Sequence, residues 1–158
     1  MAAPGGKRRT ERRQRPLSRE RIVEAAIDLL DSVGEGGLTF RALTERLATG
    51  PGAIYWHVTG KDELLHAATD AVVAAVVPPS AAGTGPREAI RALALGVFDA
   101  IDVHPWVGAQ LTRSPAATPT LRILERLGRQ VQALGVPRTA QFAAVSVLLN
   151  YIVGVAGQ

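Results

Sequence analysis

The sequence predicts an all-α protein, with an N-terminal three-helix bundle that contains a helix-turn-helix and a second helical domain after it. Apolar residues recur at spacings of three and four along most of the chain, which is the period of a helix. No stretch shows the apolar–polar alternation typical of a strand. Ala, a strong helix former, and Leu are abundant, whereas aromatic residues make up only 4%. With 47% hydrophobic residues over 158 positions, the chain is able to bury a core.

Charge and cysteine content narrow the functional classes. The chain has no cysteine, which excludes a disulfide framework, a thiolate metal site and a cysteine nucleophile. The net charge is +4, and the first 21 residues contain eight basic residues against two acidic ones. Such a basic end suggests a polyanionic partner, although a solubilising tail explains it equally well. We expect residues 1–17 to form a basic flexible arm.

The first predicted helices lie between residues 18 and 47. Ser18 is expected to cap a helix that the glycines from Gly34 onward end. Thr39 is the next candidate cap, and Leu43 and Leu47 share one face of the short helix that follows. The apolar face of the first helix comprises Ile22, Ala26, Leu29, Leu30 and Val33.

A turn over residues 48–52 then leads into a third short helix that ends near His57. Pro51 suits the first position of that helix. Thr59 and Asp62 resemble a capping box that opens a helix over residues 61–77.

The loop over residues 78–86 marks a subdomain edge, and four further helices are expected after it. They span 87–103, 106–113, 120–134 and 138–156, and breaks rich in Pro or Gly separate them. We assign residues 18–66 to the helix-turn-helix domain and 67–158 to the second domain. The uncharged stretch 139–158 is long enough to cross a bilayer, but polar interruptions such as Gln141 and Asn150 favour a buried interface helix.

Two short helices joined by a tight Gly-containing turn are the signature of a helix-turn-helix. In this motif the first helix braces the second, which projects side chains into the major groove. Leu43, Leu47 and Ile54 supply the bracing contacts. The pattern on its own is weak evidence, because many small helical proteins contain a short helix pair.

Longer runs of residues carry a specific resemblance. Leu38-Thr39-Phe40-Arg41-Ala42-Leu43, then Leu47, Ile54-Tyr55-Trp56-His57-Val58, Gly60-Lys61 and Leu64-Leu65 together resemble the tetracycline-repressor (TetR) family of regulators. The resemblance covers about residues 18–66 without a gap. The second domain, with His104-Pro105-Trp106, resembles the effector domains of that family more loosely.

The resemblance implies roles in binding double-stranded DNA. Arg41 would read a guanine edge or clamp a phosphate, and Tyr55, His57 and Lys61 would bind phosphates. The basic arm would enter the minor groove or contact phosphates. The implied DNA-binding residues are Thr39, Phe40, Arg41, Pro51, Gly52, Ala53, Tyr55, Trp56, His57 and Lys61.

Four of these residues have a structural alternative. For His57 it is a solvated surface histidine, and for Lys61 it is a surface charge in the first turn of a helix. Phe40 stands where a small hydroxyl residue would suit a DNA contact better, and its alternative is packing against the first helix. Trp56 has partial burial in the core as its alternative, because an aromatic run on a short helix more often packs inside.

For the second domain, the resemblance implies a cavity for a small-molecule effector and a homodimer that binds a palindromic operator in a bacterial cytoplasm. No motif marks the cavity, and a core or interface role is the commoner one for such residues. Family members continue with at least one more helix that completes the dimer interface, so we expect a chain ending at Gln158 to be incomplete or to dimerise through less surface. The candidate effector residues are Phe98, Asp102, His104, Trp106, Gln110, Arg113, Asn150 and Tyr151.

Enzymatic function is not expected. The sequence has no Gly-rich phosphate loop, no G-x-S-x-G and no H-E-x-x-H motif, and its three histidines lack ligand spacing, so we predict no cofactor and no metal. The alternative to a DNA-binding regulator, ligand-responsive and repressing, is a helical protein-interaction module whose helix-turn-helix no longer binds DNA. Salt-dependent DNA binding would distinguish the two.

Overall fold

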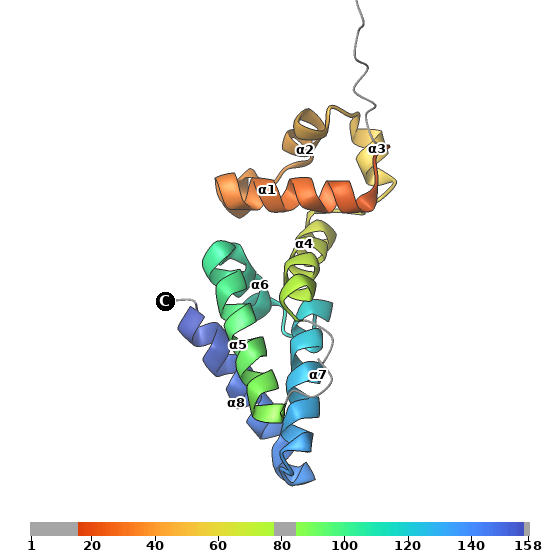
Figure 1. The fold of residues 1–158 in the computed structure, drawn as a ribbon. Coiled ribbons are helices and arrows are strands. Elements are labelled where there is room, and N and C mark those ends of the chain that lie inside the picture. Colours follow the sequence, from red (N-terminus) through yellow and green to blue (C-terminus); the bar gives the residue numbers. More distant parts are fainter. Residues whose placement is uncertain (1–15, 78–84, 157–158) are drawn as a thin grey trace, which may run out of the picture.

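The structure is a computed structural model that describes residues 16–77 and 85–156. Within these ranges the chain forms eight helices and no strand, which confirms the predicted all-α class. Figure 1 shows two parts, which we call the head and the body, joined by one helix. The predicted arm lies outside the described residues up to residue 15.

The head contains α1 (Arg19–Gly37), α2 (Phe40–Leu47) and α3 (Pro51–Tyr55). The predicted caps form, because the Ser18 side chain accepts a hydrogen bond from the Arg21 amide and the Thr39 hydroxyl accepts one from the Ala42 amide. The core of the head is aliphatic and fully enclosed. Its most deeply buried members are Ile22, Ala26, Leu43 and Ile54.

The glycine-rich end of α1 follows the prediction, but one residue beside it does not. The helix breaks at Gly34, whose φ is 69°, and α1 ends at Gly37. Val33, expected on the buried face, lies beside this kink and is exposed.

The capping box expected at Thr59 and Asp62 does not form. Gly60 is the N-cap of α4 (Lys61–Val76), and it is Glu63 that bonds to Thr59. The prediction missed the true partner by one residue, and α4 otherwise begins where it was expected.

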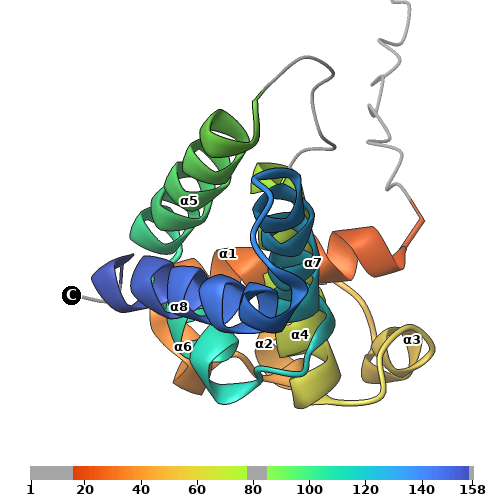
Figure 2. The ribbon, with the colours of Figure 1, turned by 90° about the horizontal axis from the view of Figure 1, so that it is seen from below.

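The body contains α5 (Pro86–Val103), α6 (Pro105–Arg113), α7 (Thr118–Ala133) and α8 (Arg138–Ala156). α4 descends from the head and packs against α5, α6 and α7, so it belongs to both parts (Figures 1 and 2). The predicted division after residue 66 falls inside this continuous helix. Core side chains of the body include Leu93, Val97, Val107, Ile123, Leu127 and Val131.

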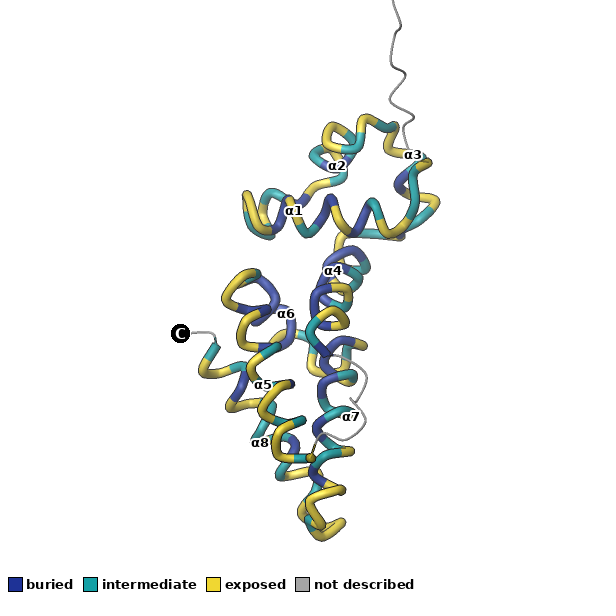
Figure 3. The backbone as a smooth tube through the Cα atoms, in the orientation of Figure 1, coloured by how far each residue is buried: buried dark blue, intermediate teal, exposed yellow. Residues whose placement is uncertain are grey.

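α8 covers α5 and α7 on one side only. Val145 and Ile152 are its buried residues, and much of its outer surface is exposed in Figure 3. Among the described residues, α8 is the one helix whose length and composition would allow it to cross a membrane. Its exposed large apolar side chains are Phe142, Val147, Tyr151 and Val155.

Candidate nucleic-acid interface

The α2–turn–α3 unit has the architecture of a helix-turn-helix. The turn passes through Ala48 in the left-handed conformation, and α3 begins at Pro51 after the Gly50 cap. Leu43 and Ile54 brace the two helices from inside as predicted, while Leu47 is half-buried. The outer side of α3 is therefore free to approach another molecule.

Two aromatic residues of the unit, Tyr55 and Trp56, lie on its surface, whereas Phe40 is half-buried. The rings of Phe40 and Tyr55 stack with centroids 4.5 Å apart and planes 8° from parallel. Phe40 in α2 thus packs against an aromatic ring of α3. The stack restrains the side chain of Tyr55, although Tyr55 is more than half exposed. Trp56 is 87% exposed, so the alternative of a partly buried Trp56 is wrong.

The first turn of α3 offers little for hydrogen bonding to bases. Pro51 and Gly52 are exposed and Ala53 is half-buried, and none of the three side chains carries a donor or acceptor. Arg41 lies at the start of α2, where its Nε donates to Glu45 Oε1 at 3.0 Å. This pair is exposed and weak, so the guanidinium is easily redirected to a nucleic acid.

The loop after α3 is held by a network around Glu63. Arg19 donates to the His57 carbonyl at 2.8 Å and to Glu63 Oε1 at 2.6 Å. Glu63 Oε2 accepts from the Thr59 amide at 2.6 Å and from its hydroxyl at 2.7 Å. These bonds, first those to Thr59 and then that from Arg19, lower the pKa of Glu63 to about 2. The network positions His57, whose backbone it holds, between α1 and α4.

Sequence reasoning missed this network. Arg19 and Glu63 lie 44 residues apart, and each alone looks like a solvated charge at the start of a helix. The one signal in the sequence was Thr59, which predicted a carboxylate partner at the start of α4. That partner was assigned to Asp62 instead of Glu63.

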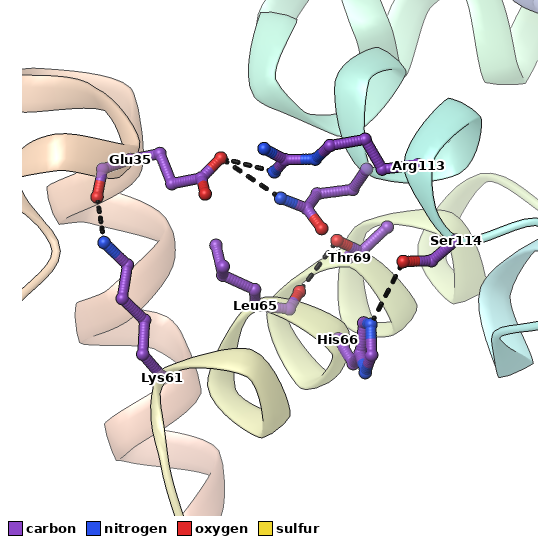
Figure 4. Close-up of polar contacts among 8 residues, drawn as sticks. Glu35, Lys61, Leu65, His66, Thr69, Arg113 and Ser114 are labelled. Carbon is purple, nitrogen blue, oxygen red and sulfur yellow. Dashed lines mark hydrogen bonds and ion pairs between the residues drawn. The ribbon is translucent and has the colours of Figure 1, made fainter.

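Lys61 lies at the first position of α4, as the resemblance required, but its ammonium is engaged. Lys61 Nζ donates to the Glu35 backbone carbonyl at 2.7 Å, across to the end of α1 (Figure 4). Lys61 is nevertheless an exposed residue, and an ammonium has three donors. A phosphate contact therefore remains compatible with this arrangement.

Half of the candidate effector residues contact the head. Asp31 Oδ1 in α1 accepts from His104 Nδ1 at 2.8 Å and from Trp106 Nε1 at 2.7 Å. One turn later, Glu35 Oε2 accepts from Arg113 at 2.5 Å and from Gln110 at 3.3 Å. We call these six residues the head–body contact.

The other four candidates are dispersed. Phe98, Asp102 and Tyr151 are exposed, and Asn150 lines a cavity of about 380 Å³ between α6 and α8, with Leu111 and Leu149 among its walls. A second cavity, of about 320 Å³, lies beside the head–body contact and includes Gln110 and Arg113. The structure therefore does not bring the eight candidates into one cavity. In the part of the chain that the structure describes, no cluster of His, Asp and Glu is placed to hold a metal ion.

Comparison with solved structures gives close matches to the whole architecture. A transcriptional regulator from Streptomyces coelicolor, SCO7222, described as a TetR, is 61% identical, with a TM-score of 0.84 over 90% of this chain and 72% of that one. BioQ, solved with its double-stranded DNA operator, is 30% identical, with a TM-score of 0.76 over 90% and 87%. ActR of S. coelicolor, solved with actinorhodin, is 26% identical, with a TM-score of 0.75 over 89% and 67%.

Sequence comparison agrees. A curated HTH-type transcriptional regulator of Saccharopolyspora erythraea is 34% identical over 139 residues, which is 87% of this chain but 59% of that protein. The chain thus spans about three fifths of the length of this curated relative. The family model for bacterial regulatory proteins of the tetR family matches residues 22–68, from the first turn of α1 into α4. Together with the match to SCO7222 over 90% of this chain and 72% of that one, this shows that the chain belongs to the TetR family of bacterial regulators.

Proposed function

We propose that this chain is a DNA-binding transcriptional regulator, a ligand-responsive repressor that binds a palindromic operator as a homodimer. The observation that carries the proposal is the exposure of Tyr55 and Trp56, and of Arg41 at the start of α2, on a helix-turn-helix whose Leu43 and Ile54 are buried. This surface lies outside the closed aliphatic core of the head. It supplies one cation and two large rings to a partner that approaches α3.

Contacts to bases and contacts to the phosphate backbone fall to different residues in this proposal. Because Pro51, Gly52 and Ala53 cannot hydrogen-bond through side chains, base reading rests on Arg41, on Tyr55 and on apolar contacts with thymine methyl groups. Tyr55, His57, Lys61 and the Thr39 hydroxyl would contact phosphates, which fix the register of the head. Trp56 and the Phe40–Tyr55 pair would provide the apolar contacts.

The body would supply dimerisation and effector response. The exposed apolar side of α8 is a suitable surface for a second copy, which would place two heads on successive half-sites. A ligand in the body would favour a dimer whose heads no longer match the operator.

The remaining parts of the proposal concern the whole protein. We propose that it acts in the bacterial cytoplasm, that its domain boundary lies near residue 66, and that it has no enzymatic activity. BioQ with its operator and ActR with actinorhodin are relatives that support this reading.

The test is selection of bound sites from random duplexes with three proteins. The unsubstituted chain is expected to enrich a palindromic site, and the Tyr55→Ala/Lys61→Ala variant is expected to lose it. Arg91→Ala is the matched control, because it removes one positive charge from the exposed side of α5, away from the head.

Loss of the site in both variants would attribute binding to net charge rather than to the head. No enriched site from a folded, unsubstituted chain would contradict the proposal and favour a protein-interaction module. An enriched site supplies the duplex with which effectors can be screened.

A further inference from the structure

Glu35 occupies an unusual position at the end of α1. It lies between Gly34, whose φ is 69°, and Gly36 and Gly37, so the backbone on both sides is free of side-chain restraint. A segment of this composition has a large conformational freedom to lose on folding. Contacts made by Glu35 itself are therefore needed to fix its backbone.

The two ends of Glu35 are bound by different parts of the molecule (Figure 4). Its carboxylate accepts from Arg113 at 2.5 Å and Gln110 at 3.3 Å, both in α6 of the body. Its carbonyl accepts from Lys61 Nζ at 2.7 Å and from the Leu38 amide at 3.3 Å. The Arg113 bond, as the largest cause, lowers the pKa of Glu35, so the carboxylate is ionised near neutral pH.

We infer that Glu35 is a positioning residue through which α6 of the body holds the Lys61 ammonium in place for a phosphate contact. Arg113 and Gln110 of α6 hold the Glu35 carboxylate in place. Because Glu35 is held, its backbone carbonyl stays in position to accept a hydrogen bond from one of the three N–H donors of Lys61. The remaining donors are left for a phosphate. This inference rests on the proposed function, because it assigns Lys61 to operator binding.

Asp31 provides a matched comparison within the same contact. It also joins α1 to α6, through His104 and Trp106, but no contact of its carbonyl reaches Lys61 among those the structure shows. Loosening Asp31 weakens the attachment of the head to the body, whereas loosening Glu35 also releases the carbonyl that holds Lys61. Asp31→Asn and Glu35→Gln therefore separate general loosening from the specific link.

The first measurement needs no DNA. Amide hydrogen exchange of Leu38, whose N–H bonds to the Glu35 carbonyl, reports how well that carbonyl is held. Arg113→Gln and Glu35→Gln are each expected to speed this exchange severalfold, and Asp31→Asn to leave it near the value of the unsubstituted chain. Because Arg113→Gln leaves Glu35 intact, it keeps the test available if Glu35→Gln fails to fold. Unchanged Leu38 exchange in a folded Arg113→Gln variant would overturn the inference.

The second measurement is the salt dependence of binding to the selected duplex. Loss of one phosphate contact lowers the slope of log K against log salt by about 0.9, so loss of the contact in both copies of the proposed dimer lowers it by about 1.8. Lys61→Gln, Glu35→Gln and Arg113→Gln are expected to lower the slope alike, and Lys61→Gln/Glu35→Gln to lower it no further than Lys61→Gln. Asp31→Asn is expected to keep the original slope.

The outcomes separate the inference from the proposed function. An unsubstituted chain that shows no salt-dependent binding would reject the proposed function. Normal binding with an unchanged slope in Glu35→Gln, or an equal loss of slope in Asp31→Asn, would overturn the role of Glu35 alone.

Discussion

Polar contacts inside the head and polar contacts between the head and the body span very different distances along the sequence. The Arg41–Glu45 pair joins residues four apart, and the network of Arg19, Thr59 and Glu63 joins residues up to 44 apart. The head–body contact joins residues 73 to 78 apart. The polar contacts of the head are thus largely internal to it, while Asp31 and Glu35 of α1 carry its hydrogen bonds to α6 of the body.

The head and the body also differ in how their apolar side chains are exposed. In the head, Tyr55 and Trp56 form one exposed aromatic surface above a closed aliphatic core. In the body, α8 exposes Phe142 and Tyr151 along its length. The head presents a small surface for a polar partner, whereas α8 presents a long apolar one, which is typical of contact with another protein.

The largest expected effect is a loss in the free energy of unfolding. Its measurement tests whether the head and the body unfold as separate cooperative units. Leu43→Ala in the head and Leu127→Ala in the body each remove a fully buried side chain. Each is expected to lower the free energy of unfolding by about 2–5 kcal/mol. Urea unfolding followed by circular dichroism checks this. Two transitions, each shifted by one variant alone, would show that the parts unfold separately, whereas one shared transition would show a single unit.

A smaller effect is expected from the Glu63 network in acid. Because the folded pKa of Glu63 is about 2 against an ordinary value of 4.5, its contribution to stability is present above pH 4.5 and is lost as the pH falls toward 2. Glu63→Gln removes this contribution, so the variant should lose less stability than the unsubstituted chain over that window. Thermal melts between pH 5 and 2 measure it, and Glu125→Gln, on the exposed side of α7, is the control. Parallel pH profiles would contradict the expectation.

The stacked pair of the head should give a modest coupling. A double-mutant cycle of Phe40→Ala and Tyr55→Ala is expected to yield a coupling energy of about 0.5–1.5 kcal/mol in the free energy of unfolding. Additive losses would mean that the stack positions Tyr55 without stabilising the head.

The smallest expected effect on stability is that of Trp56→Ala. Because Trp56 is 87% exposed, its removal should change the free energy of unfolding by no more than about 0.5 kcal/mol. Affinity for the selected duplex should nevertheless fall, as measured by fluorescence anisotropy. Unchanged affinity would remove Trp56 from the interface.

The contrast between contacts that are short-range and long-range in sequence also explains which features could be predicted from the sequence. The helices, two caps and the bracing Leu43 and Ile54 follow from residues a few positions apart, so local patterns were sufficient to predict them. His104 and Trp106 were effector candidates because the second domain resembles the effector domains of the family, which hold an apolar cavity with a few polar groups. Their hydrogen-bond partner in α1 lies more than 70 residues away, and no local pattern announces such a pairing.

One of the two tryptophans of the chain lies in the head and the other lies in the body. Trp56 lies in solvent on the head, whereas Trp106 is 8% exposed and its indole N–H is bonded to Asp31 at 2.7 Å. The chain therefore carries two tryptophan fluorophores whose emission should differ in wavelength and in access to a soluble quencher. Nucleic-acid binding would alter the quenchable, red-shifted component, and any rearrangement between head and body would alter the protected one. Both events can be followed in one unlabelled sample.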